Sequence, residues 1–220
     1  TVMTGDYIDY NPWLIDQLFL DELASMGGNV YGSGSSERLS FFGARAGDTQ
    51  INGYSGDDYL YGGDGDDIID GGEGDDTLSG GDGNDTYKYG IGSGIDTIYY
   101  YDVVHYISSS DIVEFGEGIT VSDLELARDY DDLIININGS YDTLKINFYY
   151  GQEQIDQFRF VDGTVLTWAQ MVALGWEMNG SPGNDTLYLH DGTMATFGGQ
   201  IFGYDGDDVI GGSYQSDTLD

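Results

Sequence analysis

GYSGDDYLYGGDGDDIIDGGEGDDTLSGGDGNDTYK, residues 53–88, consists of four consecutive nine-residue units that match, almost letter for letter, the pattern G-G-x-G-x-D-x-U-x, where U is a large apolar residue. The sixth position is aspartate in every unit, and the eighth is apolar in every unit. These positions hold Asp58, Asp67, Asp76 and Asp85, and Leu60, Ile69, Leu78 and Tyr87. A flexible acidic linker has no reason to keep apolar residues at a fixed spacing, so the pattern indicates a folded repeat.

Each unit combines a turn with a short strand. The glycines of the turn accept positive φ angles and carry no Cβ, so several backbone carbonyls can point toward one place, where the aspartate adds negative charge. Calcium takes about six to eight oxygen ligands in irregular geometry, whereas magnesium prefers a strict octahedron. The unit therefore predicts a calcium-binding turn, followed by an x-U-x strand whose apolar side chain points inward.

The order of the turns follows from this reading. If each unit forms one turn and one strand, successive turns fall on alternate edges of a roll, and equivalent turns lie 18 residues apart. We therefore expect Asp58 to face Asp76 and Asp67 to face Asp85, with an ion shared by each pair of turns. A degenerate unit at 46–52, in which Thr49 replaces the carboxylate, leaves open a third ion with Asp67 as its main charged ligand.

The charge balance points to a cationic partner. The 220 residues include 6 basic and 40 acidic side chains, for a net charge of −34, and 40% of the residues are hydrophobic. Self-repulsion of this size opposes compaction unless cations are bound, although the hydrophobic content is sufficient for a core. Nucleic acids and anionic membrane surfaces are poor partners, because affinity for phosphate comes from lysine and arginine. The absence of cysteine excludes disulfides and leaves calcium as the expected cross-link.

No run of 18 apolar residues is present, and the amino terminus lacks the basic and apolar regions of a signal peptide. We therefore expect neither a transmembrane helix nor a cleavable leader, and no membrane insertion by this segment. The last residues, DTLD, fall partway through a further unit, which suggests an excised segment of a longer polypeptide.

The chain before the repeats, residues 1–45, is expected to form an amino-terminal cap. Residues 9–27 read as a helix that covers the open end of the roll, with Asn11 as N-cap and Pro12 at the first helical position. Residues 28–45 are expected to be irregular. They include a decayed repeat at 32–40, in which Glu37 and Arg38 leave the ligand uncertain.

The first repeat block, 46–90, is followed by a β-rich insert at 91–178, where glycine becomes sparse. Its expected strands are 97–101, 112–115, 124–128, 133–138, 143–148 and 157–161. A short helix is expected at 167–174, because Thr167 and Gln170 have capping-box spacing.

The nonapeptide returns in a second block at 179–220. Units at 180–188, 203–211 and 212–220 place Asp185, Asp208 and Asp217 in the ligand position. The intervening stretch 194–202 lacks an acidic residue, so its turn is expected to be free of metal.

Residues 53–88 and 180–220 resemble the RTX, or haemolysin-type calcium-binding repeat, family of secreted bacterial proteins. Residues 83–98, 111–138 and 155–168 resemble the non-repeat segment between repeat blocks of large haemolysin-type proteins. The resemblance implies that several calcium ions are bound by turn carbonyls and aspartate carboxylates. In the first block these belong to Gly53, Gly56, Asp58, Gly62, Gly63, Gly65, Asp67, Gly71, Gly72, Gly74, Asp76, Gly80, Gly81, Gly83 and Asp85. In the second they belong to Gly180, Gly183, Asp185, Gly203, Gly206 and Asp208.

Tyr54, Ser181 and Tyr204 stand where the family pattern has its second glycine. A carbonyl can still ligate there, but a positive φ is more costly for these residues. Gln215 replaces the third glycine of the last unit, which puts that turn in doubt.

The resemblance implies an all-β fold, a parallel β-roll with a β-rich insert and short capping helices. It also implies export to the extracellular space or cell surface through a type I secretion channel, without a cleaved leader. The leading interpretation is a non-catalytic, calcium-dependent folding module of a larger toxin or adhesin. Two alternatives remain: an accessory module of a secreted protease, lipase or polysaccharide epimerase, and a module that binds carbohydrate or a host surface.

No constellation typical of an enzyme is present. His105 and His190 lie in no two-ligand spacing, and no GxSxG or cysteine nucleophile occurs. Adjacent carboxylates such as Asp57 and Asp58, or Asp131 and Asp132, are better explained as a ligand beside a solvated neighbour than as glycosidase acids. The tyrosines at 99–101, 106 and 149–150 could stack on sugars, but a structural role in strands is favoured.

Overall fold

The computed structural model describes residues 28–40, 47–99, 109–129, 132–147, 155–174, 177–179, 182–184, 186–188, 200–211 and 218–219. The expected helix at 9–27 lies outside these residues. Within the described part of the chain, no helix is long and apolar enough to cross a membrane.

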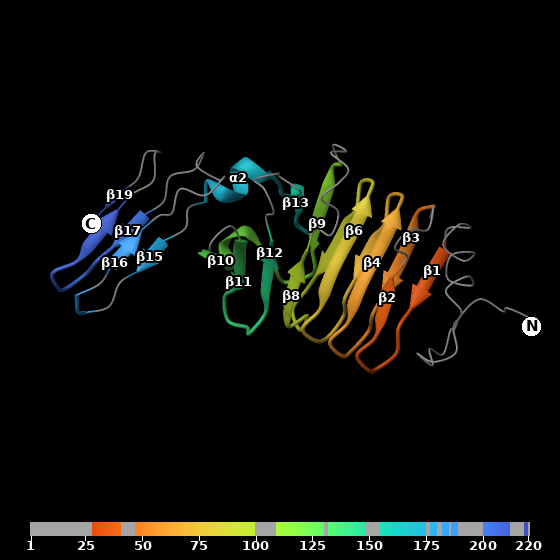
Figure 1. Cartoon of the computed structure of the whole chain (residues 1–220). Coiled ribbons are helices and arrows are strands. Elements are labelled where there is room, and N and C mark those ends of the chain that lie inside the picture. The colour runs from red at the N-terminus through yellow and green to blue at the C-terminus, as the bar shows by residue number, and fades with distance from the viewer. Residues whose placement is uncertain are drawn as a thin grey trace, which may run out of the picture.

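Two seven-stranded sheets form the main body of the molecule (Figure 1). Sheet A contains β1 (Gly28–Tyr31), β3 (Thr49–Asn52), β5 (Ile68–Asp70), β7 (Thr86–Tyr89), β9 (Asp111–Phe115), β13 (Ile155–Arg159) and β14 (Val165–Thr167), adjacent in this order. Sheet B contains β2 (Arg38–Ser40), β4 (Tyr59–Asp64), β6 (Thr77–Asp82), β8 (Ile95–Ile98), β12 (Thr143–Ile146), β11 (Asp132–Ile137) and β10 (Leu124–Asp129), again in spatial order.

The repeat strands alternate between the two sheets, as the sequence predicts for a parallel β-roll. β3, β5 and β7 pair in parallel in sheet A, and β4 pairs in parallel with β6 in sheet B. The register places Leu60 opposite Leu78 and Ile69 opposite Tyr87, so equivalent positions 18 residues apart are neighbours. The predicted fold class is confirmed.

The apolar eighth position of each unit forms the core between the sheets. Ile51, Leu60 and Ile69 are completely buried, and Leu78 is 1% exposed. Burial of one such side chain contributes about 1.5–3 kcal/mol relative to leaving it exposed. The nine-residue spacing therefore places one large apolar side chain in the core at every turn of the chain.

The structure corrects the expectation that residues 28–45 are irregular. β1 pairs with β3 and β2 pairs with β4, so the roll already includes the stretch before the predicted first block. Val30 and Leu39 are each 3% exposed and extend the apolar core. The decayed repeat at 32–40 therefore folds as a repeat, because its apolar position and its first glycine, Gly32, are retained although its second and third glycines are not.

The central segment, expected to begin as an insert at residue 91, continues both sheets instead. β8 pairs in parallel with β6, and β9 pairs in parallel with β7. Antiparallel pairing begins only at β10-β11-β12 and at the β13-β14 hairpin. Both sheets therefore continue past residue 90.

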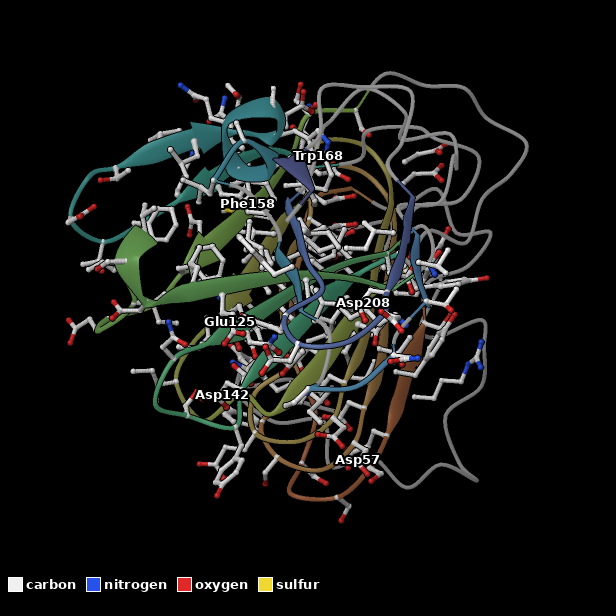
Figure 2. The ribbon with its side chains drawn as sticks, turned by 90° about the vertical axis from the view of Figure 1, so that its left-hand side faces the viewer. Asp57, Glu125, Asp142, Phe158, Trp168 and Asp208 are labelled. Carbon is white, nitrogen blue, oxygen red and sulfur yellow. The ribbon has the colours of Figure 1, made fainter. Side chains whose placement is uncertain are left out.

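Aromatic packing fills the core of this central segment. Phe115 stacks on Phe160 with ring centroids 4.9 Å apart, and Phe158 lies 5.8 Å from Trp168 of helix α2 (Trp168–Val172). Figure 2 shows Phe158 and Trp168 close together near α2. These side chains replace the regular column of aliphatic residues where the nine-residue spacing ends.

The six strands expected in this segment are all present, with ends shifted by a few residues. β8 and β13 each begin two residues before their expected starts, at 97 and 157. α2 confirms the predicted capping box: Thr167 Oγ1 accepts the N–H of Gln170, and Gln170 Oε1 accepts the N–H of Thr167. Two elements were not expected, the strand β14 and the 3-10 turn η1 (Val121–Asp123).

The second block forms sheets of its own at the opposite end of the molecule from β1 (Figure 1). One sheet contains β15 (Glu177–Asn179), β17 (Gln200–Phe202) and β19 (Thr218–Leu219), and the other contains β16 (Thr186–Tyr188) and β18 (Val209–Gly211). All of these strands pair in parallel. The stretch 194–202 thus keeps its phase through β17.

Candidate calcium-binding turns

Turns of equivalent units lie directly on top of one another. A Cβ on Gly72, whose φ is +102°, would collide with the carbonyl oxygen of Tyr54 in the neighbouring turn. Stacking this close requires glycine on at least one side of each contact. The glycine pattern therefore sets the separation of the turns as well as their curvature.

Tyr54 and Tyr204 adopt the glycine conformation despite their side chains, with φ of 72° and 63°. A left-handed backbone costs an ordinary residue about 1–2 kcal/mol. The sequence predicted that positive φ would be unfavourable at these positions, and the structure shows that the turn geometry prevails. The Tyr54 carbonyl still accepts the N–H of Glu73 in the neighbouring turn, at 2.6 Å.

The sixth-position carboxylates form one hydrogen-bonded ladder along each sheet. In sheet B, Asp58 N–H donates to Asp76 Oδ1 at 2.8 Å, and Asp76 N–H donates to Asp96 Oδ1 at 3.0 Å. Glu37 N–H starts this ladder by donating to Asp58 Oδ1 at 2.7 Å. The structure therefore places Asp58 beside Asp76, at the predicted spacing.

Sheet A carries the matching ladder. Asp67 N–H donates to Asp85 Oδ1 at 2.9 Å, and Asp85 N–H donates to Asp111 Oδ1 at 2.9 Å. Thr49 starts it, because its N–H and its hydroxyl both donate to Asp67 Oδ1, at 2.7 and 2.6 Å. Asp67 and Asp85 are thus neighbours, as the sequence predicts.

The second carboxylate oxygen of each ladder residue has a different environment. The Oδ2 atoms of Asp58, Asp67, Asp76, Asp85 and Asp96 are buried and find no hydrogen-bond partner within the described residues. Buried carboxylate oxygens are normally hydrogen-bonded or bound to a cation, because burying charge without a partner is costly. Five such atoms, three in the sheet B ladder and two in the sheet A ladder, fit metal ligation.

Backbone oxygens converge on the same places. A Cβ on Gly62 would collide with Asp67 Oδ2 of its own turn and would lie 2.6 Å from the carbonyl oxygen of Gly80 in the next. A Cβ on Gly53 would likewise meet Asp58 Oδ2 and the carbonyl oxygen of Gly71. Gly53 and Gly62 therefore each leave open a cradle lined by a carboxylate and a carbonyl, which are the oxygen types that calcium prefers.

Side-chain clusters alone would not hold a metal. Among the described residues, no three histidine, cysteine, aspartate or glutamate side chains converge on one point. The ladder carboxylates are spaced by the strand separation, so most ligands at each cradle must be carbonyl oxygens. This donor set favours calcium over zinc, which prefers nitrogen and sulfur ligands.

Burial raises the pKa of the ladder carboxyls above their ordinary value of 3.8. The pKa rises to about 7 for Asp58 and Asp67 and to about 8 for Asp85 and Asp96. Neighbouring carboxylates raise these pKa values further, whereas the N–H groups of the ladder partly offset the increase. The folded turns therefore disfavour the ionised carboxylates unless a cation neutralises them.

A second ladder runs along the fifth positions, outside the first. Asp75 N–H donates to Asp57 Oδ1 at 3.0 Å, and Asn84 N–H donates to Asp66 Oδ1 at 2.8 Å. Here the later turn donates to the earlier one, opposite to the inner ladder. Asp57 is thus not simply a solvated neighbour, as the sequence suggested, but ties adjacent turns together.

Sequence reasoning missed Asp96 and Asp111, which are 0% and 1% exposed. Gly92 and Gly94 precede Asp96, and an apolar residue follows it two positions later. This weak unit lies two residues beyond the position that the period of nine predicts. Asp111 keeps only the D-x-U triplet, which is too short to identify without the structure. Glu37, which the sequence left uncertain, occupies the sixth position of its turn.

Asp142 ends the stack of turns in sheet B. Its carboxylate accepts the N–H groups of Gly92 and Gly94 at 3.0 and 2.9 Å. Burial acts to raise the pKa of Asp142, but these N–H bonds outweigh it and lower the pKa. In Figure 2, Asp142 and Asp57 both lie toward the lower, turn-bearing side of the molecule.

The second block is described in part. Gly203 repeats the cradle, because a Cβ there would collide with Asp208 Oδ2, and a Cβ on Gly206 would lie 2.5 Å from the carbonyl oxygen of Gly183. Asp207 N–H donates to Asn184 Oδ1 at 3.0 Å, which continues the outer ladder. Predicted residues outside the described part of the chain are Gly180, Ser181, Asp185, Gln215 and Asp217, with His105, His190, Asp131 and the tyrosines at 100, 101, 106, 149 and 150.

Comparisons with known proteins agree with this geometry. Residues 45–78, 52–87, 62–98 and 177–193 match the RTX calcium-binding nonapeptide repeat, and residues 132–170 match the haemolysin-type calcium binding protein related domain. A search of curated proteins finds no match. Among solved structures, the extracellular lipase LipA from Serratia marcescens is similar at 14% identity and a TM-score of 0.24, over 87% of this chain and 29% of the lipase. The chain thus spans less than a third of that lipase. With its nonapeptide repeats and its haemolysin-type related domain, the chain belongs to the RTX family of calcium-binding repeat proteins.

Proposed function

We propose that the chain is a non-catalytic module of a larger secreted protein of the toxin or adhesin type, and that it folds when calcium binds between its stacked turns. The observation that carries this proposal is the two sets of buried aspartate Oδ2 atoms, one in each ladder, that lack a hydrogen-bond partner within the described residues. A bound cation would supply the missing partner and neutralise the crowded carboxylates.

The predicted ligand set holds the ions in this proposal. In the first block these are the carboxylates of Asp58, Asp67, Asp76 and Asp85 with carbonyls of the turn glycines. Asp96 and Asp111 extend the set, because they continue the same two ladders. In the second block, Gly180, Gly183, Asp185, Gly203, Gly206 and Asp208 have the corresponding role.

Calcium binding and folding are one process in this account. A site that is absent from the unfolded chain contributes its binding free energy to folding, about 2.7 kcal/mol per site when calcium is 100 times the dissociation constant. RTX repeat proteins are typically secreted. Low cytosolic calcium would keep the chain unfolded for export through a type I channel, and external calcium would fold it afterwards.

A calcium titration followed by circular dichroism tests this proposal. We expect a cooperative gain of β-structure at about 10⁻⁴–10⁻³ M calcium, the range of extracellular calcium modules, and no comparable gain with magnesium. A chain that is fully folded in chelator, or that responds equally to both ions, would contradict the proposal.

A further inference from the structure

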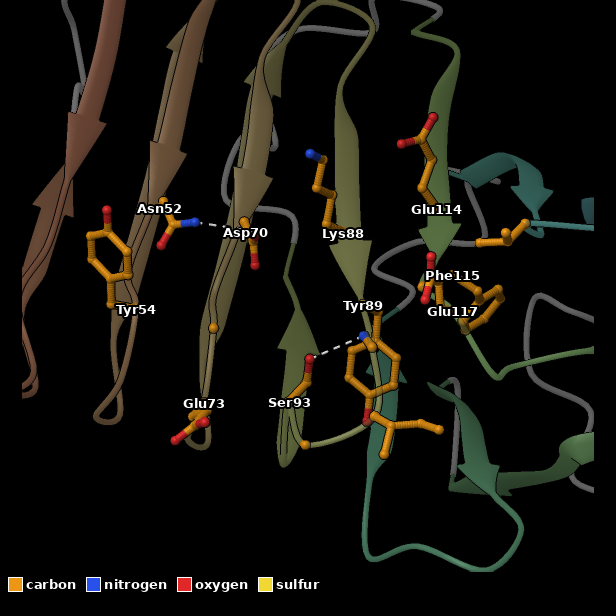
Figure 3. A pocket seen from close by; sticks show the side chains of 16 residues that line it. Asn52, Tyr54, Asp70, Glu73, Lys88, Tyr89, Ser93, Glu114, Phe115 and Glu117 are labelled. Atoms are coloured by element: carbon orange, nitrogen blue, oxygen red, sulfur yellow. Dashed lines mark hydrogen bonds between the residues drawn. The ribbon is translucent and has the colours of Figure 1, made fainter.

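A groove of about 600 Å³ crosses the outer face of sheet A (Figure 3). Its floor is a row of four polar side chains on neighbouring strands, Asn52, Asp70, Lys88 and Glu114. The strand register places each beside the next, and Figure 3 shows them side by side. With a strand spacing of about 4.8 Å, the row is about 14 Å long.

Hydrogen-bonding capacity in this floor is only partly used. Asn52 Nδ2 donates to Asp70 Oδ2 at 3.3 Å, but Asn52 Oδ1 is buried and finds no hydrogen-bond partner within the described residues. A buried acceptor without a partner costs about 1–3 kcal/mol. The row therefore offers carboxylate acceptors and the ammonium donor of Lys88 to a ligand, above a buried amide acceptor that has no hydrogen-bond partner within the described residues.

One end of the groove carries a tyrosine in a strained conformation. Tyr54 has a φ of 72° at a position where the three following units have Gly63, Gly72 and Gly81. Its ring is 45% exposed, lines the groove and stacks on Tyr31 with centroids 6.1 Å apart. Glycine at position 54 would relieve this backbone strain. The sequence has tyrosine there instead, and the tyrosine places an exposed aromatic ring in the groove.

The opposite part of the groove is apolar. Phe115 lines it, and Val161 and Ile91 are 63% and 60% exposed there. Apolar surface around a polar floor is typical of sites that bind a ligand with both apolar and hydrogen-bonding surface.

We propose that this groove binds a neutral oligosaccharide. Sugar hydroxyls both donate and accept hydrogen bonds, so they can pair with the amide, carboxylates and ammonium of the floor, while the apolar face of a sugar ring packs on Tyr54. The lining has four carboxylates, on Asp70, Glu73, Glu114 and Glu117, against one ammonium, which disfavours anionic polysaccharides and nucleic acid.

A peptide fits the groove less well than a saccharide. The floor is the face of a sheet whose backbone groups are already paired between strands, so no free edge is available for β-strand addition. Four carboxylates could attract a basic peptide, and this alternative is therefore included in the test.

The groove depends on the proposed calcium turns, because Tyr54 and Glu73 belong to the stacked turns that carry Asp58 and Asp76. Glu73 N–H donates to the carbonyl of Tyr54 at 2.6 Å. The inference therefore rests on the proposed function, and folding and sugar binding must be measured separately on the same sample.

The full chain in millimolar calcium is applied to an array of neutral oligosaccharides of glucose, galactose, mannose and N-acetylglucosamine, with oligogalacturonate and oligolysine alongside. Hits are measured by calorimetry, and circular dichroism reports calcium-dependent folding. We expect binding to a neutral oligosaccharide. Binding only to oligogalacturonate or oligolysine, or to nothing while the chain is folded, would overturn the inference.

Tyr54→Gly is the decisive variant, because it restores the glycine of the other units and removes only the ring. We expect about tenfold weaker sugar binding with calcium-induced folding preserved. Lys88→Met tests the floor and is expected to weaken binding similarly. Tyr141→Ser removes a tyrosine that is 98% exposed outside the groove and should bind like the parent.

Unchanged binding in Tyr54→Gly would reject the groove as the site. A chain that shows no calcium-dependent folding yet binds sugar through Tyr54 would instead reject the proposed function and leave the groove intact.

Discussion

Asp67→Asn is expected to change stability in opposite directions with and without calcium. In calcium it removes a charged ligand at the centre of the sheet A ladder, where Asp67 contacts both Thr49 and Asp85. Breaking one side of a buried charged pair costs about 3–5 kcal/mol, so we expect a loss of about 3 kcal/mol. In chelator the same change removes a buried carboxylate without a counter-ion, so the variant should be more stable than the parent.

Asp66→Asn provides a matched control, because it makes the same chemical change one residue away. Asp66 is exposed, and its Oδ1 accepts the N–H of Asn84, a bond that asparagine can keep. We expect an effect within about 0.5 kcal/mol in either condition. Urea unfolding of the parent and both variants in calcium, and their folded fractions by circular dichroism in chelator with sucrose as a stabiliser, measure these effects. Equal effects at 66 and 67, or the same sign at 67 in both conditions, would contradict the ligand assignment.

The calcium-free chain is expected to be more stable at pH 4 than at pH 8. Burial raises the pKa of Asp58 and Asp67 to about 7 and that of Asp85 to about 8, from 3.8. Between about pH 4 and pH 8 the folded state binds more protons than the unfolded state. The stabilisation by these protons is therefore complete below about pH 4 and is lost as the pH rises to about 8.

Calcium should reverse this dependence, because it binds the deprotonated carboxylates and competes with protons. Circular dichroism of the folded fraction in calcium-depleted buffer with sucrose as a stabiliser, and urea unfolding in excess calcium, both from pH 4 to 8.5, give the two profiles. A calcium-free chain that gains stability as pH rises from 5 to 8 would show that the buried carboxylates already have partners within the protein.

The sequence allowed the roll, its inward-pointing residues and the pairing of Asp58 with Asp76 to be predicted, because the period of nine is strict between residues 53 and 88. Prediction failed where the period changed. The two extra residues before Asp96 obscured its unit, although strand pairing with β6 restores the register in space. Pairing between strands depends on position in the sheet and not on distance along the chain.

Other features could not be read from the repeats. β1 and β2 form because Val30 and Leu39 extend an existing core, so neighbouring strands compensate for weak local turn signals. The outer ladder through Asp57 and Asp66 could not be predicted, because the sequence does not show which N–H groups the stacked turns leave available. Tyr54 shows the same dependence, because the contacts of its turn impose a φ that its own side chain disfavours.

The most direct test of the central claim is a crystal structure grown in calcium, with the ions located by their anomalous scattering. We expect anomalous peaks between stacked turns, beside the Oδ2 atoms of Asp58, Asp67, Asp76 and Asp85. Each peak should lie about 2.3–2.6 Å from its Oδ2 atom, the usual calcium–oxygen distance. Ordered turns in saturating calcium with no anomalous peak beside these atoms would contradict the central claim.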